Sequence, residues 1–175
     1  MKPILFFILF FFAGYNVVKA YDIAKIRKDY VAAVKDSKKS EELYSYLSAI
    51  KNPDAIILAY LGSAEAIRAK HSWNPYHKMS FLNEGFKKLD AAVEKDPNQL
   101  EVRFLRFTLQ HYVPDFLGHS KNIAQDKNKI INLLKNKNTG SLGAEKDLIN
   151  NMIHFMIESK ECNAHEITSL KKLSV

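Results

Sequence analysis

The residues best suited to chemistry lie in one predicted helix, where two arginines stand three positions apart. Arg103 and Arg106 fall within an otherwise apolar and aromatic stretch, and Glu65 interrupts another apolar stretch in the same way. Residues three apart share one face of a helix, and a charge removed from water needs a partner. The pattern therefore has two interpretations. One is an internal ion pair between Glu65 and one arginine, and the other is a forked cationic grip for an anionic ligand or a partner's carboxylates.

Residues 71–77 hold the only tryptophan of the chain, Trp73, together with Tyr76 and two histidines, one of which is His77. Tryptophan and tyrosine are favoured anchors at binding surfaces. A structural explanation is also open, because Asn74 is suited to cap a helix and Trp73 would then staple that helix to the preceding one. This segment is therefore a candidate binding surface with an alternative role in the fold.

Residues 113–119 lack helical periodicity and contain Pro114 and Gly118. This composition is typical of a loop. We expect a tight loop that packs Phe116 and Leu117, and the alternative is that it forms the rim of a pocket.

Metal binding and catalysis find no support in the motifs. None of the six histidines belongs to an HExxH motif or to a pair four residues apart, so the sequence predicts no metal site. Serine, histidine and acidic residues occur without a nucleophile elbow or a comparable local motif, and we predict neither catalytic residues nor a cofactor. Cys162 is the only cysteine, which excludes an intramolecular disulfide, and we expect a small, buried or partly buried residue near the last helix.

The elements that would position these residues are helices, since glycine and proline are scarce and fall between stretches with helical spacing. We predict an all-α fold of seven to eight helices in antiparallel hairpins. The alanine-rich third helix carries Gly62, where another helix would pack closely. The helices are expected over residues 22–35, 40–52 with Ser40 as cap, 53–70 opened by Pro53, 75–95 with Asn74 as cap and Pro75 first, 99–112, from Ser120 as cap, 141–159 with Ser141 as cap, and 163–173 with Asn163 and Glu166 in a capping box.

Residues 1–20 have the three parts of a secretory signal peptide. Lys2 supplies the positive start, residues 4–12 are an apolar run, and Val18-Lys19-Ala20 ends in the small residue that precedes a cleavage site. A membrane anchor is the alternative, but this run is about half of the ~20 residues that span a bilayer. We expect cleavage after Ala20, no lipid anchor because no cysteine follows the cut, and a single helical domain over residues 21–175 in the periplasm or outside the cell.

The processed chain is mildly basic, because loss of Lys2 and Lys19 lowers the net charge from +7 to about +5. Nucleic-acid binding usually involves arginine-rich clusters interleaved with aromatic residues. Here the basic residues are mostly lysines distributed among acidic residues, so we expect no nucleic-acid partner. Weak attraction to anionic polymers or membrane faces is compatible with this charge.

Two segments resemble a known repeat. Residues 91–98 (AAVEKDPN) resemble the junction between two tetratricopeptide repeats, and residues 58–62 (LAYLG) resemble the first-helix signature of that repeat. The resemblance implies a right-handed stack of helical hairpins, with a longer connection at residues 71–77 than a regular repeat contains. The chain is also similar to small exported proteins of unassigned function from Bacteroidetes-type bacteria, through residues 73–75 (WNP), 103–106 (RFLR) and 114–118 (PDFLG).

The function that these observations favour is an exported helical-repeat module that binds a protein or peptide. Its surface would combine the groove between the first helices of successive hairpins with residues 71–77. The alternative is a small anionic-ligand binder or an enzyme. Its site would be built from Arg103, Arg106, Glu65 and His77.

Overall fold

The computed structural model describes residues 21–136 and 146–174, which form eight α-helices and contain no strand. The all-α prediction is therefore confirmed. The predicted signal peptide and the predicted cap at Ser141 lie outside the described residues. No helix in the described part is long and apolar enough to cross a membrane.

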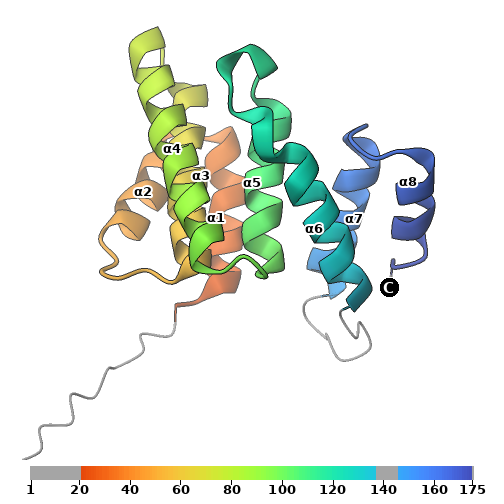
Figure 1. Ribbon diagram of the computed structural model, residues 1–175. Coiled ribbons are helices and arrows are strands. Elements are labelled where there is room, and N and C mark those ends of the chain that lie inside the picture. The colour runs from red at the N-terminus through yellow and green to blue at the C-terminus, as the bar shows by residue number, and fades with distance from the viewer. Residues whose placement is uncertain (1–20, 137–145, 175) are drawn as a thin grey trace, which may run out of the picture.

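Successive helices run in alternating directions and form an array of hairpins (Figure 1). Two short 3-10 turns, η1 and η2, connect α5 to α6. The elements are α1 (Ile23–Lys35), α2 (Ser37–Ser48), α3 (Ala55–His71), α4 (Pro75–Lys95), α5 (Leu100–Tyr112), η1 (Asp115–Leu117), η2 (Ser120–Asn122), α6 (Ile123–Asn136), α7 (Lys146–Glu158) and α8 (Ala164–Lys171).

Local capping chemistry sets where α4 and α8 begin. The side chain of Asn74 accepts hydrogen bonds from the first backbone N–H groups of α4, and Pro75 occupies the first turn. Asn163 and Glu166 form the predicted capping box at the start of α8. Both predictions are confirmed, because these caps need only residues close in sequence.

Three other predicted helix starts are wrong. The carboxylate of Asp36 caps α2 by accepting from Lys39 N at 3.0 Å, which leaves Ser40 buried inside the helix. Asp54 caps α3 in the same way, so Pro53 precedes that helix. Ser120 lies in the turn η2 and caps no helix.

The central element is α3, in which 12 of 17 residues are buried, and its closest neighbour is α4. The two helices meet backbone to backbone at Gly62 and Gly85. A methyl group added at Gly62 would lie 2.7 Å from the carbonyl oxygen of Gly85, and the reverse substitution would create the same clash. The close approach predicted from Gly62 is confirmed, and it depends on a second glycine on α4.

The apolar core consists of two clusters that meet at α5. Val102 and Leu105 pack with residues of α1 to α4, whereas Leu100 and Phe107 pack with residues of α6 to α8. The predicted burial of Cys162 is confirmed, because it belongs to the second cluster. Because α5 contributes to both clusters, its polar residues are held in fixed positions.

Candidate functional site

The two arginines on α5 are held by one carboxylate from α6. Asp126 is fully buried and accepts from Arg103 Nη1 at 2.8 Å and from Arg106 Nε and Nη2 at 2.7 and 2.8 Å. Gln110 also donates to Asp126, at 2.9 Å, and Arg106 Nη1 donates to Asp90 of α4 at 2.7 Å. The network therefore links three helices through charge-assisted hydrogen bonds.

The predicted ion pair between Glu65 and an arginine is wrong. Glu65 is buried at the contact between α3 and α4, where Lys88 Nζ donates to it at 2.6 Å.

The two arginines and their two aspartates form a group with no net charge. All three nitrogens of the Arg106 guanidinium already donate to carboxylates. This arrangement lacks the unpaired cationic fork that the ligand-grip interpretation requires.

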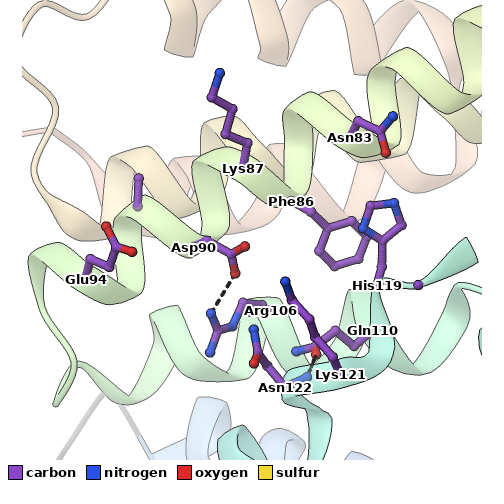
Figure 2. A pocket seen from close by; sticks show the side chains of 12 residues that line it. Asn83, Phe86, Lys87, Asp90, Glu94, Arg106, Gln110, His119, Lys121 and Asn122 are labelled. Atoms are coloured by element: carbon purple, nitrogen blue, oxygen red, sulfur yellow. Dashed lines mark hydrogen bonds and ion pairs between the residues drawn. The ribbon is translucent and has the colours of Figure 1, made fainter.

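A polar cleft lies above this network, between α4, α5 and the connection that contains η1 and η2 (Figure 2). Its volume is about 560 Å³. The ring of His119 stacks on Phe86 with 4.3 Å between the ring centres, and Figure 2 shows this pair at one side of the cleft and the Arg106–Asp90 pair at its floor. The residues that line it are Asn83, Phe86, Lys87, Asp90, Ala91, Glu94, Arg106, Gln110, Gly118, His119, Lys121 and Asn122.

The chemistry available in the polar cleft is limited. Burial lowers the pKa of His119, which favours the neutral ring, and its Nε2 has no hydrogen-bond partner among the described residues. The described residues that line the cleft include no serine, threonine or cysteine. Gln110 is occupied twice, since it donates to Asp126 and accepts from Asn122 N. The floor of the cleft therefore serves mainly to fix the connection between α5 and α6.

A second, larger hollow is apolar and is lined chiefly by the first helix of each hairpin. We call it the apolar groove. It has a volume of about 820 Å³, which falls within the ~300–1,000 Å³ typical of ligand sites. The lining residues are Tyr30 and Val34 of α1; Ala66, Ile67, Ala69 and Lys70 of α3; Lys78 and Leu82 of α4; Phe104, Leu105, Thr108, Leu109 and Tyr112 of α5; Val113 and Pro114; and Leu148, Asn151, Met152 and Phe155 of α7.

Phe155 connects the α5 and α7 walls of the apolar groove. Its ring meets Phe104 edge to face at 5.6 Å and Tyr112 at 5.9 Å. On the α1 wall, burial raises the pKa of Tyr30 to about 12, so this phenol is neutral at physiological pH. Among the described residues that line the groove, Lys70 and Lys78 are the only charged ones, and neither forms an ion pair with another described residue. The groove thus offers an apolar surface with a basic rim.

The predicted binding residues of the α3–α4 connection are exposed. Trp73 is 98% exposed and Tyr76 is 84% exposed, so the predicted staple between Trp73 and the preceding helix is wrong. His77 is also exposed, on the first turn of α4, and lies apart from the buried charge network at Arg103 and Arg106. The structure therefore does not bring together the four residues of the alternative ligand site.

Phe116 is a further exposed aromatic residue, at 85% exposure. The prediction that it packs within a tight loop is wrong, because η1 turns its side chain outward while Leu117 remains half-buried. The alternative prediction for this segment is confirmed, since Val113 and Pro114 line the apolar groove and Gly118 lines the polar cleft.

Two acidic residues with central positions were not predicted from the sequence. Asp126 lies four residues before Ile130 on the apolar face of α6, so a charge on an apolar face was the available signal. Glu101 is buried at the start of α5 and accepts from both Arg27 of α1, at 2.6 and 2.8 Å, and the Tyr60 hydroxyl of α3. An acidic residue is common in the first turn of a helix whether it is exposed or buried, so the sequence carried no signal for the burial of Glu101.

No group of three or more histidine, cysteine, aspartate or glutamate residues in the described ranges is placed to hold a metal ion. Comparisons of the chain with protein-family models, with curated proteins and with solved structures give no match.

Proposed function

We propose that this chain is an exported helical-repeat protein whose apolar groove binds an apolar segment of another protein or peptide. The observation that carries the proposal is the groove itself, since it is open, about 820 Å³ in volume and lined mostly by aliphatic and aromatic side chains. An amphipathic helix or an extended peptide buries alternate or i, i+4 apolar residues in such a groove.

The arrangement of the hairpins supports a stack like that of tetratricopeptide repeats. The first helices α1, α3, α5 and α7 contribute most of the groove, whereas α2, α6 and α8 contribute none of the residues that line it. A surface assembled from the same helix of each successive hairpin is the usual binding surface of helical-repeat proteins. The exposure of Trp73 and Tyr76 beside it also favours binding to a partner.

The alternative, a small anionic-ligand site at Arg103 and Arg106, has less support. Both guanidinium groups are buried and already donate to Asp126. A ligand there would have to displace a buried carboxylate, which costs several kcal/mol.

The test selects peptides from a random phage-displayed library against the chain and measures their affinity for two charge-introducing variants. Thr108→Glu places a carboxylate in the apolar groove, whereas Ala124→Glu places one on the exposed surface of α6. We expect the selected peptides to share spaced apolar residues and to bind Thr108→Glu at least about tenfold more weakly, because a charge must then be buried against them. The Ala124→Glu variant should bind like the unmodified chain.

Equal binding of the selected peptides to all three proteins would contradict the proposal, as would a library that yields no peptide. Circular dichroism melting of both variants separates a loss of binding from a loss of folding. Leu82→Ser, on the α4 wall of the groove, supplies a second variant if Thr108→Glu unfolds.

A further inference from the structure

The four most exposed large apolar side chains in the described ranges are all aromatic and share one end of the helical array. Trp73 is 98% exposed, Phe116 85%, Tyr76 84% and Tyr112 71%; Val31 follows at 60%. They belong to the α3–α4 corner, the first turn of α4, the end of α5 and η1, and Figure 1 shows these segments at the same end of the molecule. We call these four residues the aromatic end.

The aromatic end is not part of the folded core. Single exposed apolar residues are ordinary on a protein surface, but four large aromatic side chains exposed at the same end of the array indicate an interaction site. Tyr112 touches Phe155 but is still largely exposed, and neither Trp73 nor Phe116 contacts another aromatic ring in the described part of the chain. The free energy gained by burying these side chains is therefore available for binding a partner.

The charge at the aromatic end is positive. Residues 70–78 and 112–121 contribute Lys70, Lys78 and Lys121 and the carboxylate of Asp115, and a second carboxylate, Glu161, lies near Tyr112, where it contacts His111. Lys78 and Lys121 form no ion pair with a described residue, and Lys70 donates to the neutral carbonyl oxygen of Val34 at 2.8 Å. These three charges are therefore not neutralised within the structure.

We propose that the aromatic end docks reversibly on the surface of an anionic lipid bilayer. Tryptophan and tyrosine favour the membrane–water interface, and lysines near the surface each contribute about 1 kcal/mol toward anionic lipids. The aromatic side chains stand on separate corners, so a rigid protein partner would need a separate pocket for each of them. A bilayer interface accepts exposed aromatic side chains without matching pockets.

The docking is peripheral, and it shares Tyr112, Lys70 and Lys78 with the wall of the apolar groove. No described helix is able to span the bilayer, and a few side chains inserted at the interface give only weak, reversible binding. A failure of vesicle binding would leave the groove proposal untouched, because the two experiments use different ligands and different variants.

The experiment uses the chain from Tyr21 onward, which retains every residue that the structure describes, and vesicles of phosphatidylcholine with or without phosphatidylglycerol. Trp73 is the only tryptophan, so its fluorescence reports on the aromatic end directly. We expect its emission to shift to shorter wavelength with phosphatidylglycerol vesicles and the protein to sediment with them. High salt should reverse both effects, because the lysine contribution is screened.

Variants separate the contributions of the aromatic residues and the lysines. Phe116→Ala should weaken vesicle binding about tenfold, as expected for an apolar side chain that leaves the bilayer. Lys78→Gln should weaken it about fivefold at low salt. Tyr46→Ala is the matched control, because Tyr46 is 48% exposed on α2 outside the aromatic end, and it should leave binding unchanged.

Unchanged Trp73 emission with anionic vesicles would overturn the proposal, as would an equal loss of binding in Tyr46→Ala and Phe116→Ala. A shift in emission that depends on protein concentration without vesicles would assign the aromatic end to a second copy of the chain and would also overturn it.

Discussion

Removal of the charge at Asp126 tests whether the two arginines of α5 serve the fold. In Asp126→Asn, Arg103 loses its only carboxylate and Arg106 keeps only Asp90, whose side chain is 40% exposed. Breaking a buried ion pair by removing one partner costs about 3–5 kcal/mol. A domain of this size has a total stability of about 5–15 kcal/mol, so the variant should lose a large share of it.

The assay is urea denaturation followed by circular dichroism, with the free energy of unfolding extrapolated to water. We expect a large fall in the midpoint with little change in the slope. The control is Asp29→Asn, because Asp29 forms an exposed pair with Lys25 on α1 and should lose less than about 1 kcal/mol. A combined variant, Arg103→Met, Arg106→Met and Asp126→Leu, should recover most of the lost stability, since apolar residues often replace a buried ionic group without cost.

A loss below about 1 kcal/mol in Asp126→Asn would refute this reasoning, because it would show that the arginines reach solvent or another partner. A stable Asp126→Asn variant that newly binds an anion such as sulfate would support the ligand-grip interpretation of the two arginines.

Three further outcomes follow from the structure. Gly62→Ala should destabilise the protein by about 1–3 kcal/mol in thermal unfolding, because the new methyl group meets the Gly85 carbonyl oxygen at 2.7 Å, whereas the same change in an unobstructed helix stabilises. Burial raises the pKa of Tyr30 to about 12 and also raises the pKa of Tyr60, so the folded protein resists ionisation of both phenols. Stability should be retained up to the ordinary tyrosine pKa near 10 and lost as the pH rises above it. Absorbance titration should show these two phenols ionising only with unfolding. The predicted signal peptide implies that the exported chain begins at Tyr21, and mass spectrometry of that chain would reveal any other start.

The parts of the fold that the sequence predicted are those that depend on neighbouring residues. Asn74 caps α4 through backbone groups two and three residues away, so its role follows from local chemistry. Ser40 was assigned a cap by the same rule, but the better acceptor Asp36 takes that role four residues earlier. Local rules identify a helix and leave its first residue uncertain when several residues are able to cap it.

Rules based on neighbouring residues did not predict which residue pairs with each buried charge. Glu65 pairs with Lys88, 23 residues away, and the two arginines of α5 pair with an aspartate of α6. The sequence indicated that each buried charge needs a partner, and every buried charge in the described ranges has one. Which partner is chosen depends on how the helices rotate against each other, as at the contact of Gly62 with Gly85.

The structure reverses the roles that residue type alone suggests. Arg103 and Arg106 are typical of ligand sites, yet Asp126 neutralises them within the core. Phe116 was expected to pack within its loop, yet it stands in water, and the exposure of Trp73 excludes the staple and leaves its role as a binding anchor. A buried charge that is already neutralised offers little binding energy to a ligand. Exposed apolar surface offers binding energy without the cost of removing a charge from water. We therefore expect the partner among apolar peptides and lipid surfaces before small anions.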